Sequence, residues 1–197
     1  EYDFRREYIS RNWATGYDSK ALQNGAFIQR EMMHRIPQGM QSFVINTRQP
    51  KFSDRRVRKA IGMVMDFEWL NKTLFFDSYK RNTSFFLNTD FEARGRPSKA
   101  ELKKLEPHRA SVPQALFTQA PSVPVNDGSG NARDNLLIAQ DLLNQAGYFV
   151  KDGVRIDPNT GRQMHIEFLL RQATMQRILG AMRKNLERLG ISASIRL

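Results

Sequence analysis

The chain has 197 residues, no cysteine and a formal net charge of +11, from 31 lysines and arginines against 20 aspartates and glutamates. The lack of cysteine excludes disulfides, thiolate catalysis and cysteine-ligated zinc, and no apolar stretch approaches the roughly 20 residues that a membrane helix needs. The length suits one domain or a domain and a half, and the positive charge favours acidic partners such as nucleic acid or anionic lipid.

Two strands are expected in the first 47 residues. Residues 1–9 alternate apolar and polar side chains, and residues 39–47 have a continuous apolar centre, which is typical of a strand buried on both faces. The stretch NWATGYDSKALQNG between them indicates a loop with a short helical piece.

The most basic stretch of the chain reads FSDRRVRKAIGMVMDFEWL. From Val57 onwards its apolar residues recur at helical spacing, which predicts one buried face of a helix capped by Ser53 or Asp54. Its four cations lie off that face. Because cations at a helix N-terminus oppose the helix dipole, they do not serve helix stability, and they raise the question of nucleic-acid binding. Asp66 is expected to cap a second helix.

Residues 77–130 are the least regular part of the chain and contain five prolines. Within them, Ser98 and Glu101 have the spacing of a capping box at the start of a short helix that Pro107 ends. A proline-rich loop follows at about 107–130. A connection of this length is more often functional, or wrapped over a surface, than idle.

Regular structure is expected again in the last third. The stretch ARDNLLIAQDLLNQAG predicts a helix that ends at Gly147, and Asp152-Gly153 between apolar residues indicates a two-residue hairpin. A strand, a helix that ends at Gly190 and the closing strand ISASIRL predict a parallel pair with a crossover helix. The fold class is therefore α/β, a mixed sheet with flanking helices. Because no turn residue follows the last strand, we expect a fragment of a longer protein.

Two stretches together resemble bacterial extracellular solute-binding proteins of the oligopeptide, dipeptide and nickel class, known as family 5. The second stretch, AQDLLNQAGYFVKDGVRIDPNTGRQMHIEFLL, is followed, as in the family, by a helix containing NLERLGI and by a strand. The lead-in YDFRREYISRNWATGYD looks like the microcin C and oligopeptide subgroup. The first stretch, FVINTRQPKFSDRRVRKAIGMVMDFEWLNKTLF, matches the family pattern at Asn46, Pro50, Phe52, Asp54, Arg56, Val57, Arg58, Ala60 and Asp66.

The resemblance implies a periplasmic receptor, monomeric when intact, that delivers a peptide-like ligand to an ABC permease in the inner membrane. It implies one lobe of a two-lobed, type II periplasmic-binding-protein-like fold, with residues 1–47 linking the lobes and residues 48–197 forming the C-terminal lobe. The cations of the basic stretch are then best explained as an exposed face. Contact with the permease or the other lobe is the first alternative, and a nucleic-acid-binding module is the second.

A ligand cleft between the lobes would be lined by residues at the edges of the linking strands. Trp13 and Phe43 would cover peptide side chains, neighbouring polar residues would hydrogen-bond the peptide, and Arg81 would pair with a carboxylate. Core packing is the alternative for Trp13 and Phe43. The candidates are Asn12, Trp13, Gln38, Met40, Gln41, Phe43 and Arg81, with Tyr79 and Phe85 as weaker neighbours of Arg81.

The sequence contains no catalytic constellation, cofactor motif or close-spaced metal-ligand set. Its three histidines are scattered, and neither a GxSxG motif nor a glycine-rich phosphate loop occurs. His165 is expected to form a surface pair with Glu167. We therefore expect no metal, no cofactor and no enzyme activity, and a hydrolase that reuses the fold is the third hypothesis, behind binding and nucleic-acid recognition.

Overall fold

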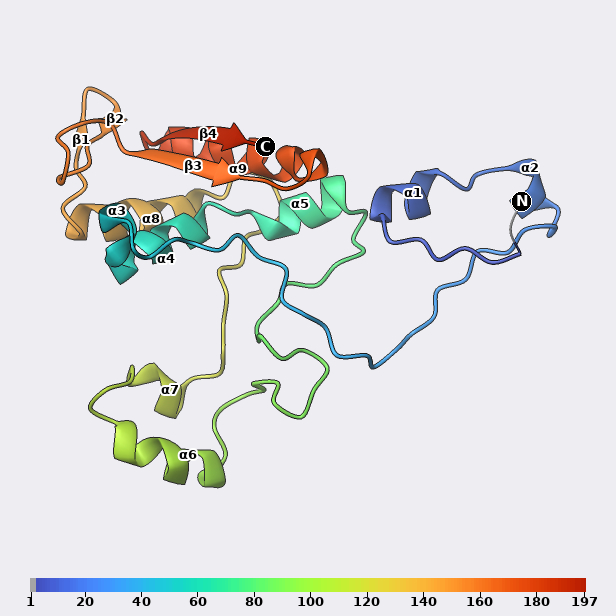
Figure 1. Cartoon of the computed structure of the whole chain (residues 1–197), viewed down its shortest axis with the longest axis horizontal. Helices are drawn as coiled ribbons and strands as arrows, with labels where there is room; N and C mark the ends of the chain where they lie inside the picture. The colour runs from blue at the N-terminus through green and yellow to red at the C-terminus, as the bar shows by residue number, and fades with distance from the viewer. Residues whose placement is uncertain (1–2) are drawn as a thin grey trace. The chain divides into compact units, whose positions relative to one another are not determined.

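The computed structural model describes residues 3–197, which divide into two units. The first unit contains the residues up to Phe27, Val44–Tyr79 and Pro124–Leu197, and the second contains Ile28–Phe43 and Lys80–Val123. Figure 1 traces the chain through both. Within residues 3–197 no helix has the length and apolar character needed to cross a bilayer.

Helices supply most of the buried core of the first unit. Helix α4 packs mainly on α8, and its buried residues Val57, Ala60 and Ile61 lie at the spacing predicted from the basic stretch. Figure 1 shows α4 running beside α8. The helices are α3 (Pro50–Ser53), α4 (Arg55–Met63), α5 (Phe67–Leu74), α8 (Arg133–Gln145) and α9 (Gln176–Arg188), with a short 3₁₀ turn η2 (Ala173–Met175) before α9.

The predicted helix ends are confirmed. The Asp54 carboxylate accepts the backbone N–H of Arg56 at 2.7 Å where α4 begins, and the Asp66 carboxylate accepts that of Trp69 at 3.1 Å where α5 begins. After α8, Gly147 has a φ of 89°, the left-handed conformation that ends many helices.

Strands β3 (His165–Leu169) and β4 (Ser192–Arg196) form the predicted parallel pair, with α9 between them in the chain. Their register pairs His165 with Ser192. Along β3, Ile166 and Phe168 are buried while the residues between them are exposed, so one face of the pair contributes to the core. Each such apolar side chain contributes about 1.5–3 kcal/mol on burial. Figure 1 shows the pair running alongside α9.

The predicted hairpin joins β1 (Val150–Lys151) to β2 (Val154–Arg155) in antiparallel pairing. Asp152 and Gly153 have φ values of 50° and 78°, as a two-residue hairpin turn with both central residues left-handed requires. Parallel and antiparallel pairing therefore both occur, as two separate two-stranded sheets in the described chain.

The two strands predicted near the N-terminus are not formed. Residues 3–9 lack strand structure (residues 1–2 lie outside the described chain), and helices α1 (Ser10–Thr15) and α2 (Lys20–Gln23) follow. Residues 39–47 also form no strand, and Val44 is 91% exposed. An apolar run becomes a buried strand only where neighbouring strands satisfy its backbone, and no described strand pairs with either segment.

The second unit contains the capping box predicted at Ser98 and Glu101, with both of its hydrogen bonds. Its helices are short. A guanidinium–aromatic contact holds their turn together, because the Arg109 guanidinium lies 4.0 Å from the centroid of the buried Phe117 ring. The elements are α6 (Lys99–Leu105), η1 (Glu106–His108) and α7 (Ala115–Thr118).

Residues 124–131, at the end of the proline-rich loop, are bound to the helices of the first unit. The backbone N–H of Asn126 donates to Glu68 of α5 at 2.9 Å, and the Asn135 amide of α8 donates to the Val125 carbonyl at 3.0 Å. Gly130, with a φ of +83°, lies against the Trp69 ring so closely that a Cβ there would be 2.8 Å from it. Of the two alternatives expected for this connection, a functional role or wrapping over a surface, these contacts agree with the second for residues 125–130.

Candidate functional site

Two of the four cations in the basic stretch have partners within the first unit. Arg56 forms an ion pair with Asp54 at 2.6 Å and donates to the Gln145 carbonyl at the end of α8 at 2.7 Å. Arg58 donates to the carbonyls of Phe52 and Ser53, the last residues of α3, at 2.8 and 2.7 Å. These two arginines therefore join helix ends to one another, and their geometry gives the nucleic-acid alternative no support.

Asn12 and Trp13, the first two site candidates, lie on α1 and are half-buried. The Asn12 carbonyl accepts the backbone N–H of Gly16 at 2.7 Å, and a Cβ on Gly16 would stand 2.8 Å from that oxygen. The close approach fixes the end of α1 and thereby the backbone that carries both candidates.

Glu7 is an ordered carboxylate just before α1 that sequence reasoning missed. It accepts the Tyr17 hydroxyl at 2.6 Å, the backbone N–H groups of Tyr8 and Ile9 at 2.9 and 3.0 Å, and the Arg5 guanidinium at 3.2 Å. The Tyr17 bond, followed by those from the backbone, lowers the pKa of Glu7 to about 2. Nothing in the sequence distinguishes Glu7 from other acids, because its partners depend on the turn that brings Tyr17 back to it.

The other five candidates belong to the second unit. The backbone N–H of Gln38 donates to the Leu87 carbonyl at 3.0 Å, and its side-chain amide donates to the Ile36 carbonyl at the same distance. Gln41 is exposed, while Met40, Phe43 and Arg81 are half-buried. Gln38 thus uses its amide N–H inside the unit, which leaves its side-chain oxygen to meet a ligand.

Exposed phenylalanines lie on both sides of Leu87, the residue that pairs with Gln38. Phe85 is 73% exposed and Phe91 80%, and Phe86 packs edge-to-face against Phe91 with ring centroids 6.2 Å apart. Phe85 was a weaker candidate, whereas Phe86 and Phe91 were not predicted, although the pair of adjacent phenylalanines was a visible signal. Exposed aromatic surface beside extended backbone is the kind of surface that covers apolar peptide side chains.

Tyr79, the remaining weak candidate, is fixed in the first unit. The Asn71 side chain donates to the Tyr79 carbonyl at 2.9 Å and accepts its backbone N–H at 3.1 Å. The Tyr79 ring meets Phe75 edge-to-face with centroids 4.9 Å apart. These contacts secure the end of α5 rather than a ligand.

The chemistry of His165 differs from the prediction. Its Nδ1 lies 2.9 Å from the Ser192 hydroxyl and its Nε2 2.8 Å from that of Ser194, while Glu167 pairs with Arg196 at 3.0 Å. The expected His165–Glu167 pair is therefore wrong. The parallel register brings residues of β4 next to both side chains, and each side chain bonds to β4 and not to the other. Over residues 3–197 no group of three or more His, Cys, Asp or Glu is arranged to hold a metal ion.

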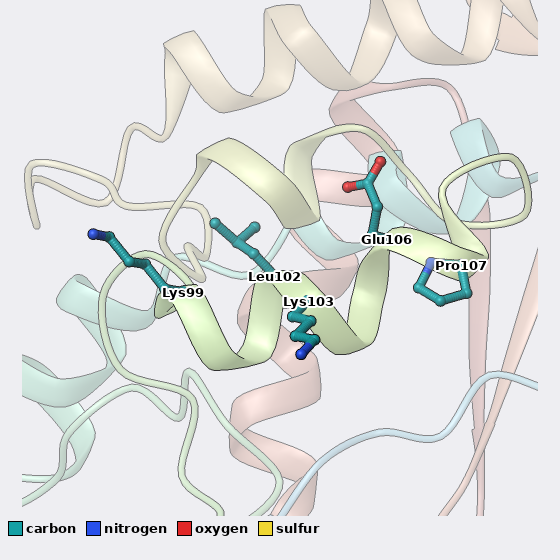
Figure 2. A pocket seen from close by; sticks show the side chains of 5 residues that line it. All are labelled: Lys99, Leu102, Lys103, Glu106 and Pro107. Atoms are coloured by element: carbon teal, nitrogen blue, oxygen red, sulfur yellow. The ribbon is translucent and has the colours of Figure 1, made fainter.

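The hollows in the surface do not coincide with the predicted candidates. A hollow of about 700 Å³ in the second unit is lined by side chains of α6 and the turn after it, all labelled in Figure 2. A hollow of about 430 Å³ in the first unit lies between α3, β3 and the turn before β3. The lining residues of the first are Lys99, Leu102, Lys103, Glu106 and Pro107.

Comparison with known protein families decides the class. The family described as "Bacterial extracellular solute-binding proteins, family 5 Middle" matches this chain over residues 1–197. The chain belongs to this family. The predicted membership and the predicted α/β class are therefore confirmed, and the family is one of binding proteins.

Among its relatives, the YejA protein of Escherichia coli strain K12 is 40% identical over 195 residues, which cover 99% of this chain and 32% of that protein. The "Probable peptide-binding protein YejA" of Agrobacterium fabrum is 37% identical over 196 residues, 98% of this chain and 32% of that protein. This family member thus spans about a third of the length of the curated relatives that it matches.

Solved structures with a similar arrangement include an ABC transporter substrate-binding protein from Sinorhizobium meliloti, with a TM-score of 0.47 and 18% identity, covering 77% of this chain and 25% of that one. Another is the oligopeptide binding protein from Thermus thermophilus complexed with a pentapeptide, with a TM-score of 0.45 and 19% identity, covering 73% of this chain and 19% of that one.

Proposed function

We propose that this chain is the middle part of the substrate-binding component of an ABC importer, which captures oligopeptide-like solutes and delivers them to a membrane permease. The observation that carries the proposal is the family match over residues 1–197. A relative 37% identical over nearly the whole chain and named a probable peptide-binding protein supports peptides as the solute class.

In this proposal residues 1–47 link two lobes and residues 48–197 belong to the C-terminal lobe. The ligand lies between the lobes and contacts both, so binding shifts the receptor from open to closed. The receptor works in the periplasm as a monomer, its protein partners are the permease subunits, and it catalyses no reaction. Closure around the ligand is what the permease would recognise.

The ligand is held extended. Asn12, Gln38 and Gln41 offer hydrogen-bonding groups to its backbone, and Trp13 and Phe43 cover its side chains. Met40 adds a polarisable apolar surface, and Arg81 pairs with a carboxylate of the ligand. The exposed phenylalanines after residue 84 extend the apolar wall on the side of the Gln38–Leu87 bridge.

The proposal is tested by calorimetry with short peptides on two proteins. One is the 197-residue chain, and the other is a chimera in which this chain replaces the matching third of the Agrobacterium relative. We expect the chimera to bind with a Kd of about 1 μM, and the chain alone to bind at least about a hundredfold more weakly because one wall cannot exclude water from the ligand. Equal binding by both, or steeply salt-dependent binding of duplex DNA with no peptide binding, would contradict the proposal.

A further inference from the structure

A polar hollow of about 430 Å³ in the first unit has no role in the proposed peptide cleft. It lies where α3, the start of β3 and the turn between β2 and β3 meet, and no candidate cleft residue lines it. Its volume is ample for a small ligand or for one group of a larger one. Its lining residues are Lys51, Asp157, Thr160, Arg162, Gln163 and His165.

The turn that forms one side of the hollow is firmly held. The Asp157 carbonyl accepts the backbone N–H of Gly161 at 2.8 Å and that of Thr160 at 3.2 Å, and Gly161 has the positive φ, 68°, that such a turn favours. The side-chain amide of Gln163 donates to the Gly190 carbonyl at 3.0 Å, which attaches the end of the turn to the segment between α9 and β4. The backbone of the turn is therefore held in place before any ligand arrives.

Three hydrogen-bond donors face the hollow with capacity left. Lys51 Nζ uses one N–H on the His165 carbonyl at 2.7 Å and has two more. The Arg162 guanidinium has no hydrogen-bond or ion-pair partner among residues 3–197. The Thr160 hydroxyl oxygen accepts the backbone N–H of Arg162 at 3.3 Å, which leaves its O–H free to donate.

The remaining lining groups do not cancel these donors. Both ring nitrogens of His165 are engaged by serine hydroxyls of β4. Asp157, which is buried, is the one carboxylate in the lining, and its Oδ1 accepts both the backbone and the side-chain N–H of Asn159 at 2.9 Å. Lys51 and Arg162 outnumber the single carboxylate, so the site carries a net positive charge. A bound cation would be repelled by Lys51 and Arg162, whereas a bound anion would accept hydrogen bonds from both and from Thr160.

We propose that this hollow is a second ligand site that binds a small oxyanionic group, a phosphate or a carboxylate, through Lys51, Arg162 and Thr160. The site shares no residue with the proposed peptide cleft, so the anion is a ligand of its own. Arg162 is the residue on which the proposal depends most, because its guanidinium offers a planar pair of donors and has no other task in the fold.

The test is a titration of the full chain with inorganic phosphate and, separately, with acetate, at constant ionic strength, followed by backbone amide chemical shifts. We expect saturable shifts confined to residues 157–165 and to Lys51 with its immediate neighbours. Arg162→Ala should weaken binding about tenfold, Arg162→Lys should weaken it less, and Arg171→Ala, an exposed arginine outside the hollow, should leave it unchanged. Tighter binding of phosphate than acetate would identify a dianion as the preferred group, and the reverse a carboxylate.

Two results would overturn the proposal. One is the absence of saturable shifts with both anions. The other is equal weakening by Arg162→Ala and Arg171→Ala, which would mean that the anions respond only to the net charge of +11. Among residues 3–197 the Arg162 side chain makes no hydrogen bond or ion pair that its replacement would break, so we expect the variant to fold. An unchanged spectrum away from the hollow checks this.

Discussion

Arg155 has the largest of the fully buried side chains in residues 3–197, although it is a cation. Its side chain is 1% exposed and has no carboxylate within ion-pair distance over residues 3–197. It donates to the Leu189 carbonyl at 2.8 Å, the Tyr148 carbonyl at 2.7 Å and the Asn144 amide oxygen at 2.8 Å. These acceptors lie at the C-terminal ends of α8 and α9, where the helix dipoles favour a cation. Burial lowers the pKa of Arg155.

Arg155→Met should destabilise the fold by about 2–4 kcal/mol, because it leaves buried acceptors without donors while keeping most of the side-chain volume. Urea unfolding followed by circular dichroism measures the change. Arg196→Met is the matched control, since Arg196 makes only an exposed ion pair with Glu167 and should cost at most about 1 kcal/mol. Equal losses for the two variants would show that the buried bonds of Arg155 contribute little.

Glu7 gives the N-terminal segment a defined response to acid. Its pKa in the folded chain is about 2, below the ordinary value of 4.5, so its contribution to stability is fully present above pH 4.5 and is lost as the pH falls towards 2. The amide resonances of Tyr8 and Ile9, which donate to Glu7, should therefore titrate with a midpoint near 2. A midpoint at 4.5 would show that the carboxylate is not held. Glu7→Gln should abolish the transition.

At the scale of elements, the sequence predicts what local rules determine. The helical spacing of α4, the capping carboxylates Asp54 and Asp66 and the hairpin turn at Asp152 are all confirmed because each depends on residues a few positions apart. The strand expected at residues 39–47 fails because a strand depends on partners far away in the chain. Arg155 could not be predicted for the same reason, since its acceptors come from two helix ends.

The attachment of residues 124–131 to α5 is an element-scale contact that one substitution tests. Gly130→Ala should destabilise the fold by about 1–3 kcal/mol, because its φ is +83° and the added Cβ would meet the Trp69 ring at 2.8 Å. Gly153→Ala is the control: its φ is +78°, but no atom lies within 4 Å of the added Cβ, so only the backbone strain of about 1 kcal/mol remains. Thermal unfolding compares the two. A smaller loss for Gly130→Ala than for Gly153→Ala would contradict the packing against Trp69.

At the scale of the whole molecule, short motifs were enough to predict the family, but they do not identify the residues that bind the ligand. Motif positions such as Asp54 and Asp66 are structural caps, and local hydrogen bonds to the first turns of α4 and α5 account for them in this chain. The residues that line a cleft between lobes come from distant parts of the chain, so no fixed sequence spacing identifies them. The seven candidates fall into two sets, two residues in the first unit and five in the second, and no local sequence rule links the sets.

The central claim is that this chain supplies one wall of a peptide-binding cleft. The most direct measurement is photo-crosslinking of a peptide that carries benzoylphenylalanine to the chimera with the Agrobacterium relative, with the labelled residues mapped by mass spectrometry. The account predicts labels at or beside Trp13, Phe43 and Arg81, which excess unmodified peptide removes. The account would be contradicted if the labels that excess peptide removes lay only on other surfaces of these 197 residues. It would also be contradicted if they lay only in the other two thirds of the chimera.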